Sequence, residues 1–476
     1  MKKETKTSII IIVILVIALV GLIIFAVTKN NNSNENNSTV NSSNMEEPPE
    51  RPDGNSQTMG EPPAKPDGNS ENGGMQPPSG RNGGKPGESN SASSSATYTG
   101  ATTIEEDKSE SKVSYSSTTG AQNALLAKSG NSTISNATIT KSGDESSEDS
   151  DFYGTNAAVL AYNSATLNIE NSSITTEGSH ANAVFAYGTG KINISNSTIK
   201  TTKNNSGGVM VTGGGTLTAN NCTVTTNGNS SASIRSDRGG GLLTVNKGTY
   251  TTNGVGSPAI YSTAKIVVND ATLISTASEG VVVEGKNSIT LNNVTLTDTN
   301  TTLNGNSETY KNIFLYQSMS GDADEGTATF TARNSTITTN KGDTIFVTNT
   351  NAVVNLSNNK IVNSDGDFLR IQAGKWGKSG SNGGTVTLNM ENQEVEGNII
   401  VDSISTLTMN MISSSEYIGT INADNSAKSI NLKLDATSRI TLTGNSYVTS
   451  LEDADSSYSN INFNGYKLYV NGTAIN

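Results

Sequence analysis

The chain has 476 residues, with 43 Asp and Glu against 31 Lys and Arg, and it contains one Cys, one His and one Trp. One Cys excludes a disulfide framework and Cys-based zinc or iron–sulfur sites, and one His excludes a His-rich metal centre. The net charge of -12 argues against a nucleic-acid partner, because phosphate binding depends on clustered Lys and Arg.

The N-terminal segment has the pattern of a membrane anchor. Ile9 to Val27 carries no charge, and at about 1.5 Å per residue it reaches roughly 28 Å, close to the thickness of a bilayer core. Lys2, Lys3 and Lys6 precede it, so the positive-inside rule predicts a cytoplasmic N-terminal tail, a single span over 9–27 and an exported remainder at the cell membrane. The alternative is a cleaved signal peptide, but the apolar run is longer than such peptides usually have.

Residues 28–97 have the composition of a disordered linker. Nine of the ten prolines fall between Pro48 and Pro86, among Gly, Asn and Ser with almost no aliphatic residues. Such a segment cannot offset its ordering entropy by burying apolar surface. We therefore expect a mobile stalk between the anchor and a domain that begins near residue 98.

From about Tyr98 onward the sequence repeats. An Asn flanked by aliphatic residues recurs every 23 to 26 residues where no insertion intervenes, and this length fits one coil of a parallel β-solenoid. The clearest copies are Leu167–Ile174, Ile192–Ile199, Leu217–Val224, Ile289–Leu296 and Val354–Ile361, with Asn at 171, 196, 221, 293 and 358.

Each repeat reads as three short strands. Period-two alternation predicts that Val184, Leu167 and Ile174 point into the core, whereas Asn168 and Asn193 face water. The recurrent Asn suits a tight turn, because Asn tolerates left-handed backbone angles, and stacked coils would let its amide bond the coils above and below. The predicted fold is all-β: a right-handed parallel β-helix over residues 98–476 with about 11 to 13 coils.

The Ile192-Asn-Ile-Ser-Asn-Ser-Thr-Ile199 type of coil resembles the parallel β-helix proteins of the pectin-lyase-like class, especially surface-exposed members from Gram-positive bacteria. The resemblance covers roughly residues 98–476. It implies a right-handed β-helix and a polysaccharide groove along the first sheet, but the fold hosts lyases, hydrolases, binding modules and adhesins alike.

The outward side chains of the first strand form the most informative column. Register across the coils stacks apolar and aromatic residues at about 4.8 Å spacing, and an apolar row of this kind marks a contact surface if it is exposed. Insertions at about 141–155, 298–311, 317–327 and 372–384 border the same face. The predicted column contains Leu126, Leu160, Phe185, Met210, Arg235, Tyr261, Val283, Leu315, Phe346, Arg370 and Ile400.

Two interpretations of the column remain open. In one, the insertions fold over it as ordinary packing. In the other, they wall a sugar-binding groove whose apolar and aromatic floor accepts the C–H faces of sugars, while arginines bond hydroxyls or carboxylates. The predicted ligand-binding residues are Phe185, Tyr187, Met210, Arg235, Tyr261, Phe346, Arg370 and Trp376.

We do not expect catalysis. His180 lies in Ser-His-Ala, and Leu369-Arg370-Ile371-Gln372 lacks the lysine of the polygalacturonase-type Arg-Ile-Lys motif. Asp365 and Asp367 have a spacing compatible with a glycosidase carboxyl pair, but Asp-Gly-Asp is also a common loop sequence. A polysaccharide lyase remains the enzymatic alternative.

No cofactor is predicted, although calcium has a weak candidate site in the 317–327 insertion. Asp322, Asp324 and Glu325 offer the carboxylate oxygens that calcium prefers, while a solvated acidic loop is the simpler interpretation. A broken threonine ladder on the third strand, as at Thr223 and Thr225, gives ice binding little support, since Thr also suits exposed strands.

The sequence thus favours a membrane-anchored, extracellular and monomeric β-helix that acts as a non-catalytic adhesin or polysaccharide-binding module. Its expected partners are the membrane, through residues 9–27, and a host or cell-wall glycan. A purely structural protein of the cell envelope is the main alternative.

Overall fold

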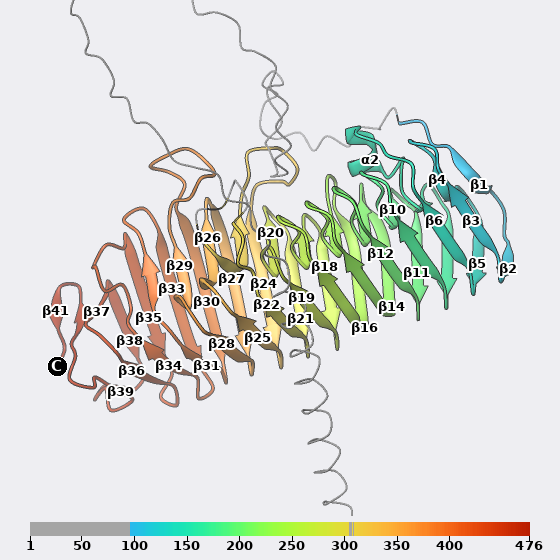
Figure 1. Cartoon of the computed structure of the whole chain (residues 1–476). Coiled ribbons are helices and arrows are strands. Elements are labelled where there is room, and N and C mark those ends of the chain that lie inside the picture. The colour runs from blue at the N-terminus through green and yellow to red at the C-terminus, as the bar shows by residue number, and fades with distance from the viewer. Residues whose placement is uncertain (1–95, 304–306, 308) are drawn as a thin grey trace, which may run out of the picture. The chain divides into compact units, whose positions relative to one another are not determined.

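The computed structural model describes residues 96–303, 307 and 309–476. The predicted tail, anchor and most of the predicted linker lie outside these residues. Within the described part, about 15 turns of a parallel β-solenoid follow one another, and Figure 1 shows their strands side by side from the blue N-terminal coils to the red C-terminal ones. The predicted number of 11 to 13 coils was too low.

The first sheet is wholly parallel and takes one strand from each of twelve coils. Its strands are β1 (Gly100–Ile104), β4 (Asn123–Ala127), β7 (Val159–Ala161), β10 (Val184–Tyr187), β13 (Val209–Thr212), β15 (Ile234–Ser236), β17 (Ile260–Ser262), β20 (Val281–Glu284), β23 (Lys311–Tyr316), β26 (Asp343–Thr348), β29 (Leu369–Ile371) and β32 (Ile399–Val401).

The second and third strands of the coils join in one larger sheet, in which β14 and β16 each run through both positions. The second-strand elements are β2 (Ser109–Ser111), β5 (Asn131–Ser135), β8 (Thr166–Glu170), β11 (Lys191–Ser195), β14 (Gly215–Thr226), β16 (Gly241–Thr252), β18 (Lys265–Asn269), β21 (Ser288–Asn292), β24 (Thr327–Arg333), β27 (Thr350–Ser357), β30 (Gly384–Glu391), β33 (Thr406–Ile412), β35 (Ser429–Leu434) and β38 (Ser450–Asp453). The third-strand elements are β3 (Ser114–Ser117), β6 (Thr138–Lys141), β9 (Ser173–Thr176), β12 (Thr198–Thr201), β19 (Thr272–Ser275), β22 (Thr295–Asp298), β25 (Thr336–Thr339) and β28 (Lys360–Asn363).

The C-terminal coils form two smaller sheets. The first contains β31 (Glu394–Glu396), β34 (Glu416–Gly419), β36 (Arg439–Leu442) and β39 (Ile461–Asn462). The second contains β37 (Ser446–Val448), β40 (Leu468–Val470) and β41 (Thr473–Ala474). The pairing of β40 with β41 is antiparallel, so a hairpin covers the edge of β40.

The core is the stacked inward side chains of all three strands. Val184, Leu167 and Ile174 are completely buried, as the alternation predicted, and their equivalents in other coils form one continuous apolar cluster. Since neighbouring coils bury the same positions, each coil stabilises the next, and an isolated coil could not bury its own apolar face.

The Asn turn is also confirmed. Asn171, Asn196, Asn221, Asn293 and Asn358 all have φ values between 47° and 54°. Such positive φ angles are costly for most side chains but accessible to Asn. The amides stack as expected: Asn221 Nδ2 donates to Asn196 Oδ1 over 2.8 Å, and this inter-coil bond offsets part of the cost of the left-handed turn.

Candidate functional site

The first half of the outward column is covered, not exposed. Leu126, Leu160, Phe185 and Met210 stack in register through β4, β7, β10 and β13, and all four have 0% exposure. The prediction that Phe185 and Met210 floor an open groove is therefore wrong.

Two segments make this cover. The rings of Tyr98 and Tyr162 stack at 4.4 Å and pack on the column together with Tyr187. The insertion before β7 forms the short helix α2 (Glu148–Tyr153), and Gly154 at its end has a left-handed φ of 75° and passes so close to Phe185 that an added Cβ would lie 2.8 Å from the ring. Packing of these segments removes apolar surface from water. The first half of the column is therefore covered by ordinary packing, the simpler of the two interpretations. Tyr187, a predicted ligand contact, belongs to the cover.

The second half of the column is a separate aromatic cluster under the later insertions. Tyr261 and Phe346 are each 5% exposed, and they pack with Phe314, Tyr316 and Trp376. Trp376 lies on the 372–384 insertion, where it packs over the cluster instead of facing a ligand. Tyr261, Phe346 and Trp376 are thus brought together as predicted, but as a small core.

The register of two column members differs from the prediction. Val282 and Phe314 pair with Tyr261 and Phe346, whereas Val283 and Leu315 point into the solenoid core. Both strands are apolar at three successive positions, so their sequences contain no alternation from which the outward residue could be read.

The two arginines of the column are held in ion pairs. Arg235 is 9% exposed and its guanidinium bonds Asp237 Oδ2 at 2.8 and 3.1 Å. Arg370 is partly exposed and contacts Asp343 at 2.7 Å and Asp367 at 2.5 Å. Neither guanidinium is free for a ligand, and the Asp367 carboxylate, proposed as half of a glycosidase pair, is neutralised by Arg370.

A network of buried carboxylates lies beneath the 317–327 insertion. Glu284 accepts hydrogen bonds from the hydroxyls of Tyr261, Ser318 and Tyr316, the last over 2.8 Å. Burial raises the pKa of Glu284, although these three hydrogen bonds oppose the shift. Burial likewise raises the pKa of Asp237 to about 6, against the opposing charge of Arg235. The hydrogen bonds of Glu284 to Tyr316 and Ser318 fix the start of the insertion over the sheet.

Arg238 joins the two insertions that cover the column. Its Nε contacts Asp322 Oδ1 at 2.7 Å, its Nη1 contacts Glu148 Oε2 at 3.1 Å, and its guanidinium lies 3.7 Å from the centre of the Phe152 ring. Asp322, a predicted calcium ligand, is thus neutralised by an arginine. Among the described residues no group of three or more His, Cys, Asp and Glu side chains is placed to hold a metal ion.

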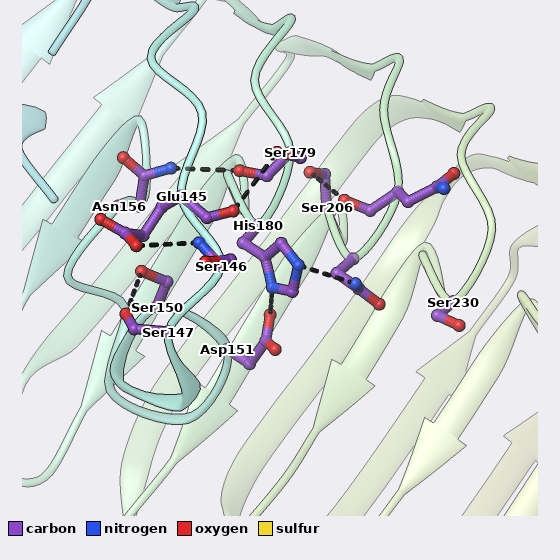
Figure 2. Close-up of polar contacts among 12 residues, drawn as sticks. Glu145, Ser146, Ser147, Ser150, Asp151, Asn156, Ser179, His180, Ser206 and Ser230 are labelled. Atoms are coloured by element: carbon purple, nitrogen blue, oxygen red, sulfur yellow. Dashed lines mark hydrogen bonds and ion pairs between the residues drawn. The ribbon is translucent and has the colours of Figure 1, made fainter. Parts of the chain in front are cut away.

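His180 fixes α2 to the neighbouring coils, a role that its sequence context did not indicate. It occupies a turn with φ of 52°, its Nδ1 lies 2.8 Å from Asp151 Oδ1 on α2, and its Nε2 lies 2.9 Å from Asn205 Nδ2 on the next coil. Figure 2 shows the His180 imidazole with its dashed contact to Asp151. If Asn205 donates to Nε2, the ring proton is on Nδ1 and is donated to Asp151.

The open surface lies next to the column, between two insertions. A groove of about 790 Å³ separates the 317–326 segment from the 372–384 segment. Its lining is mostly amides, hydroxyls and glycines, with two lysines, one glutamate and two apolar side chains: Gln317, Met319, Glu325, Gly326, Asn349, Thr350, Asn351, Lys378, Gly380, Ser381, Gly383, Thr385, Ser403, Ile404 and Lys428.

One wall of the groove is held by bonds to the solenoid. Asn349 Nδ2 donates to the Gln317 carbonyl over 2.8 Å, and the Lys286 amide donates to the Asp324 carbonyl over 2.8 Å. Together with the Asp322–Arg238 ion pair, these bonds fix the segment before any ligand arrives.

The other wall is held in the same way. The Ala373 amide donates to Asp402 Oδ2 over 2.7 Å, and Asn382 Nδ2 donates to the carbonyls of Gly374 and Trp376 at 2.8 and 3.0 Å. A ligand that enters the groove would therefore meet two preorganised walls, which reduces the entropic cost of binding.

Comparison with known proteins supports the fold. A family model described as a right-handed β-helix region matches residues 123–299. The fold is a right-handed parallel β-helix. The match covers less than half of the chain and is to a fold that enzymes and non-enzymes share. No curated protein and no solved structure matches the chain significantly.

The predicted membrane span falls outside the described residues. In 96–303 and 309–476, no helix combines the length and the apolar character needed to cross a bilayer.

Proposed function

We propose that this protein is a membrane-anchored, extracellular and non-catalytic module that binds a polysaccharide in the groove between residues 317–326 and 372–384. The observation that carries the proposal is the groove itself, an open and preorganised concavity beside the first sheet. The right-handed β-helix fold, which carbohydrate-binding proteins and pectate-lyase-like enzymes share, supports it at the level of fold.

The lining has the chemistry of a sugar site. Asn351 and Thr385 are exposed and present an amide and a hydroxyl that can exchange hydrogen bonds with sugar hydroxyls. Met319 is 68% exposed, and with Ile404 it offers apolar surface for the C–H faces of a pyranose. A few polar groups placed around apolar surface are typical of small-ligand sites. Within the lining no carboxylate pair is available, since Glu325 is its single acidic residue, and this supports binding without catalysis.

The proposal is tested by filling the groove. Ser381 is exposed on its wall, so Ser381→Trp should block a glycan without disturbing the core. The full chain is applied to immobilised polygalacturonate, methyl-esterified pectin, dextran and peptidoglycan. We expect wild-type protein to bind at least one polymer, and Ser381→Trp to lose most of that binding.

The matched control places the same bulk on the third-strand face, where Thr223 is also exposed. Thr223→Trp should bind like the wild type. Equal binding by wild type and Ser381→Trp, or no binding to any polymer, would contradict the proposal and favour the structural envelope protein. Absorbance from unsaturated uronic acids during incubation with pectin would instead identify a lyase.

A further inference from the structure

We infer that the outward face of the third strands binds crystalline water, that is, the surface of ice. This function goes beyond the proposed glycan binding and uses a different face of the solenoid. Two observations carry it: the register of the coils and the bonding of the hydroxyl groups on this face. The sequence pattern, which gave ice binding little support, shows neither of them.

One outward column of the third strands consists of hydroxyl side chains alone. It crosses eight consecutive coils in register, and each member is exposed or partly exposed. This hydroxyl column contains Thr138, Ser173, Thr198, Thr223, Thr249, Thr272, Thr295 and Thr336.

A second outward column lies two residues further along each strand. In the same eight coils it is interrupted by Lys200 and Ile274 and otherwise contains Thr140, Thr175, Thr225, Thr251, Thr297 and Thr338. The breaks in the threonine ladder thus fall in one column and leave the hydroxyl column whole.

The preference of Thr for exposed strands does not account for the hydroxyl column. The second strands belong to the same sheet and also have outward positions open to solvent. One of their columns reads Lys191, Thr216, Leu242, Lys265 and Ser288 in five successive coils. Strand formation therefore tolerates varied side chains there, and the hydroxyl column is more uniform than the fold requires.

The hydroxyl groups of this column are available to an external partner. Within the described residues, none of them forms a hydrogen bond to the protein. Other polar columns of the sheet bond internally: the inward Thr226 hydroxyl donates to the Ser231 carbonyl, and Asn269 Nδ2 donates to Asn246 Oδ1. The third strands thus present hydroxyls that bond solvent.

The two columns form a regular array. Neighbouring coils lie about 4.8 Å apart, and outward residues two positions apart on a strand are separated by about 6.7 Å. Hexagonal ice has surface repeats close to both spacings, so the waters of one ice plane can bond successive coils in step. A single hydroxyl gains little over its bonds to liquid water, and many matched positions are needed to hold a protein on ice.

The side chains suit this partner better than a sugar or a protein. A β-branched Thr has a restricted χ1 angle, so the array is ordered before it meets a lattice and loses little entropy there. Neither column contains an aromatic residue within these eight coils, and Lys200 is their one charged member. The face therefore lacks the aromatic anchors on which protein interfaces depend.

The test is incorporation of the full chain into slowly growing ice. Fluorescently labelled wild-type protein should enter the ice, whereas albumin, as the reference, stays in the liquid. Thr198→Trp and Thr295→Lys alter two exposed members of the hydroxyl column, and each should lose most of the incorporation. Ice recrystallisation in a frozen sucrose solution gives a second readout, in which the wild type should keep crystals small.

The matched control is Leu242→Trp, which places the same ring on an exposed position of the second-strand column. It should enter ice like the wild type. Circular dichroism and thermal unfolding verify that the variants keep the fold. Wild-type protein that stays in the liquid with albumin would overturn the inference. Equal incorporation of the wild type and both column variants, or an equal loss in Leu242→Trp, would also overturn it.

Discussion

At the scale of single residues, the solenoid places a carboxyl group at a third-strand position that takes hydroxyls in most other coils. Asp298 ends β22 and pairs with Ser275 and Thr339 in the coils on either side. It is 1% exposed, and burial raises its pKa to about 8, although the Asn300 amide opposes the shift. The folded protein therefore binds a proton that the unfolded chain releases near pH 4.

This linkage predicts a loss of stability as pH rises. Below pH 4 the Asp298 carboxyl is protonated in both states and does not lower the free energy of unfolding. As the pH rises from 4 toward about 8, the unfolded chain ionises first, so the free energy of unfolding falls. Asp298→Asn should consequently raise the free energy of unfolding at pH 8, by an amount on the order of a few kcal/mol, and change it little at pH 4. Thermal unfolding at the two pH values measures this.

Asp365→Asn is the matched control, because Asp365 is exposed in an outer turn and its replacement should have little effect at either pH. A variant Asp298→Asn that is less stable than the wild type at pH 8 would show that the ionised carboxylate is tolerated there.

At the scale of elements, the insertions act as braces and not as open loops. Arg238 connects α2 with the 317–327 insertion through Glu148 and Asp322, across 90 and 84 residues of sequence. Because both contacts use one guanidinium, its loss should loosen both segments together, whereas an ammonium, as a point charge, cannot satisfy the same geometry.

Arg238→Ala is therefore expected to speed amide exchange in residues 145–153 and 317–326 and to cost about 1–3 kcal/mol of stability, and Arg238→Lys should recover only part of this. Hydrogen–deuterium exchange measures the two segments separately. Arg333→Ala, at an exposed position of β24, serves as the control. Faster exchange in only one segment, or in neither, would contradict the bracing role.

The same elements show what could be predicted from the sequence. The Asn turns and inward residues such as Val184 follow from local patterns that every coil repeats, so they were predicted correctly. The burial of Phe185 depends on how the α2 insertion folds, and the pair of His180 with Asp151 joins residues 29 apart through that insertion. Non-repeating segments have no second copy for comparison, which is why the sequence left open whether the insertions cover the column, and why it placed the floor of the groove on the column.

At the scale of the whole molecule, the fold depends on coils stacked in register. Six successive pairings on the third strand connect Lys200 with Thr225, Thr251, Ile274, Thr297, Thr338 and Val362. At about 4.8 Å per coil, Lys200 and Val362 should lie roughly 29 Å apart in backbone distance.

Spin labels at these two exposed positions test that spacing. The native Cys222 is replaced by Ser, a mild change because Ser197 and Ser172 occupy the equivalent position in the preceding coils. Double electron–electron resonance should give one narrow distribution near the expected distance. A broad distribution, or one centred far from it, would contradict the stacked register.

The central claim is that the ligand occupies the groove and not the buried first-strand column. Hydrogen–deuterium exchange of the full chain, with and without a saturating amount of the polymer that it binds most tightly, tests it most directly. Binding should slow exchange in residues 317–326, 372–384 and around Lys428, and leave the third strands unchanged. Protection on the third strands, or none in the two groove walls at saturation, would contradict the account.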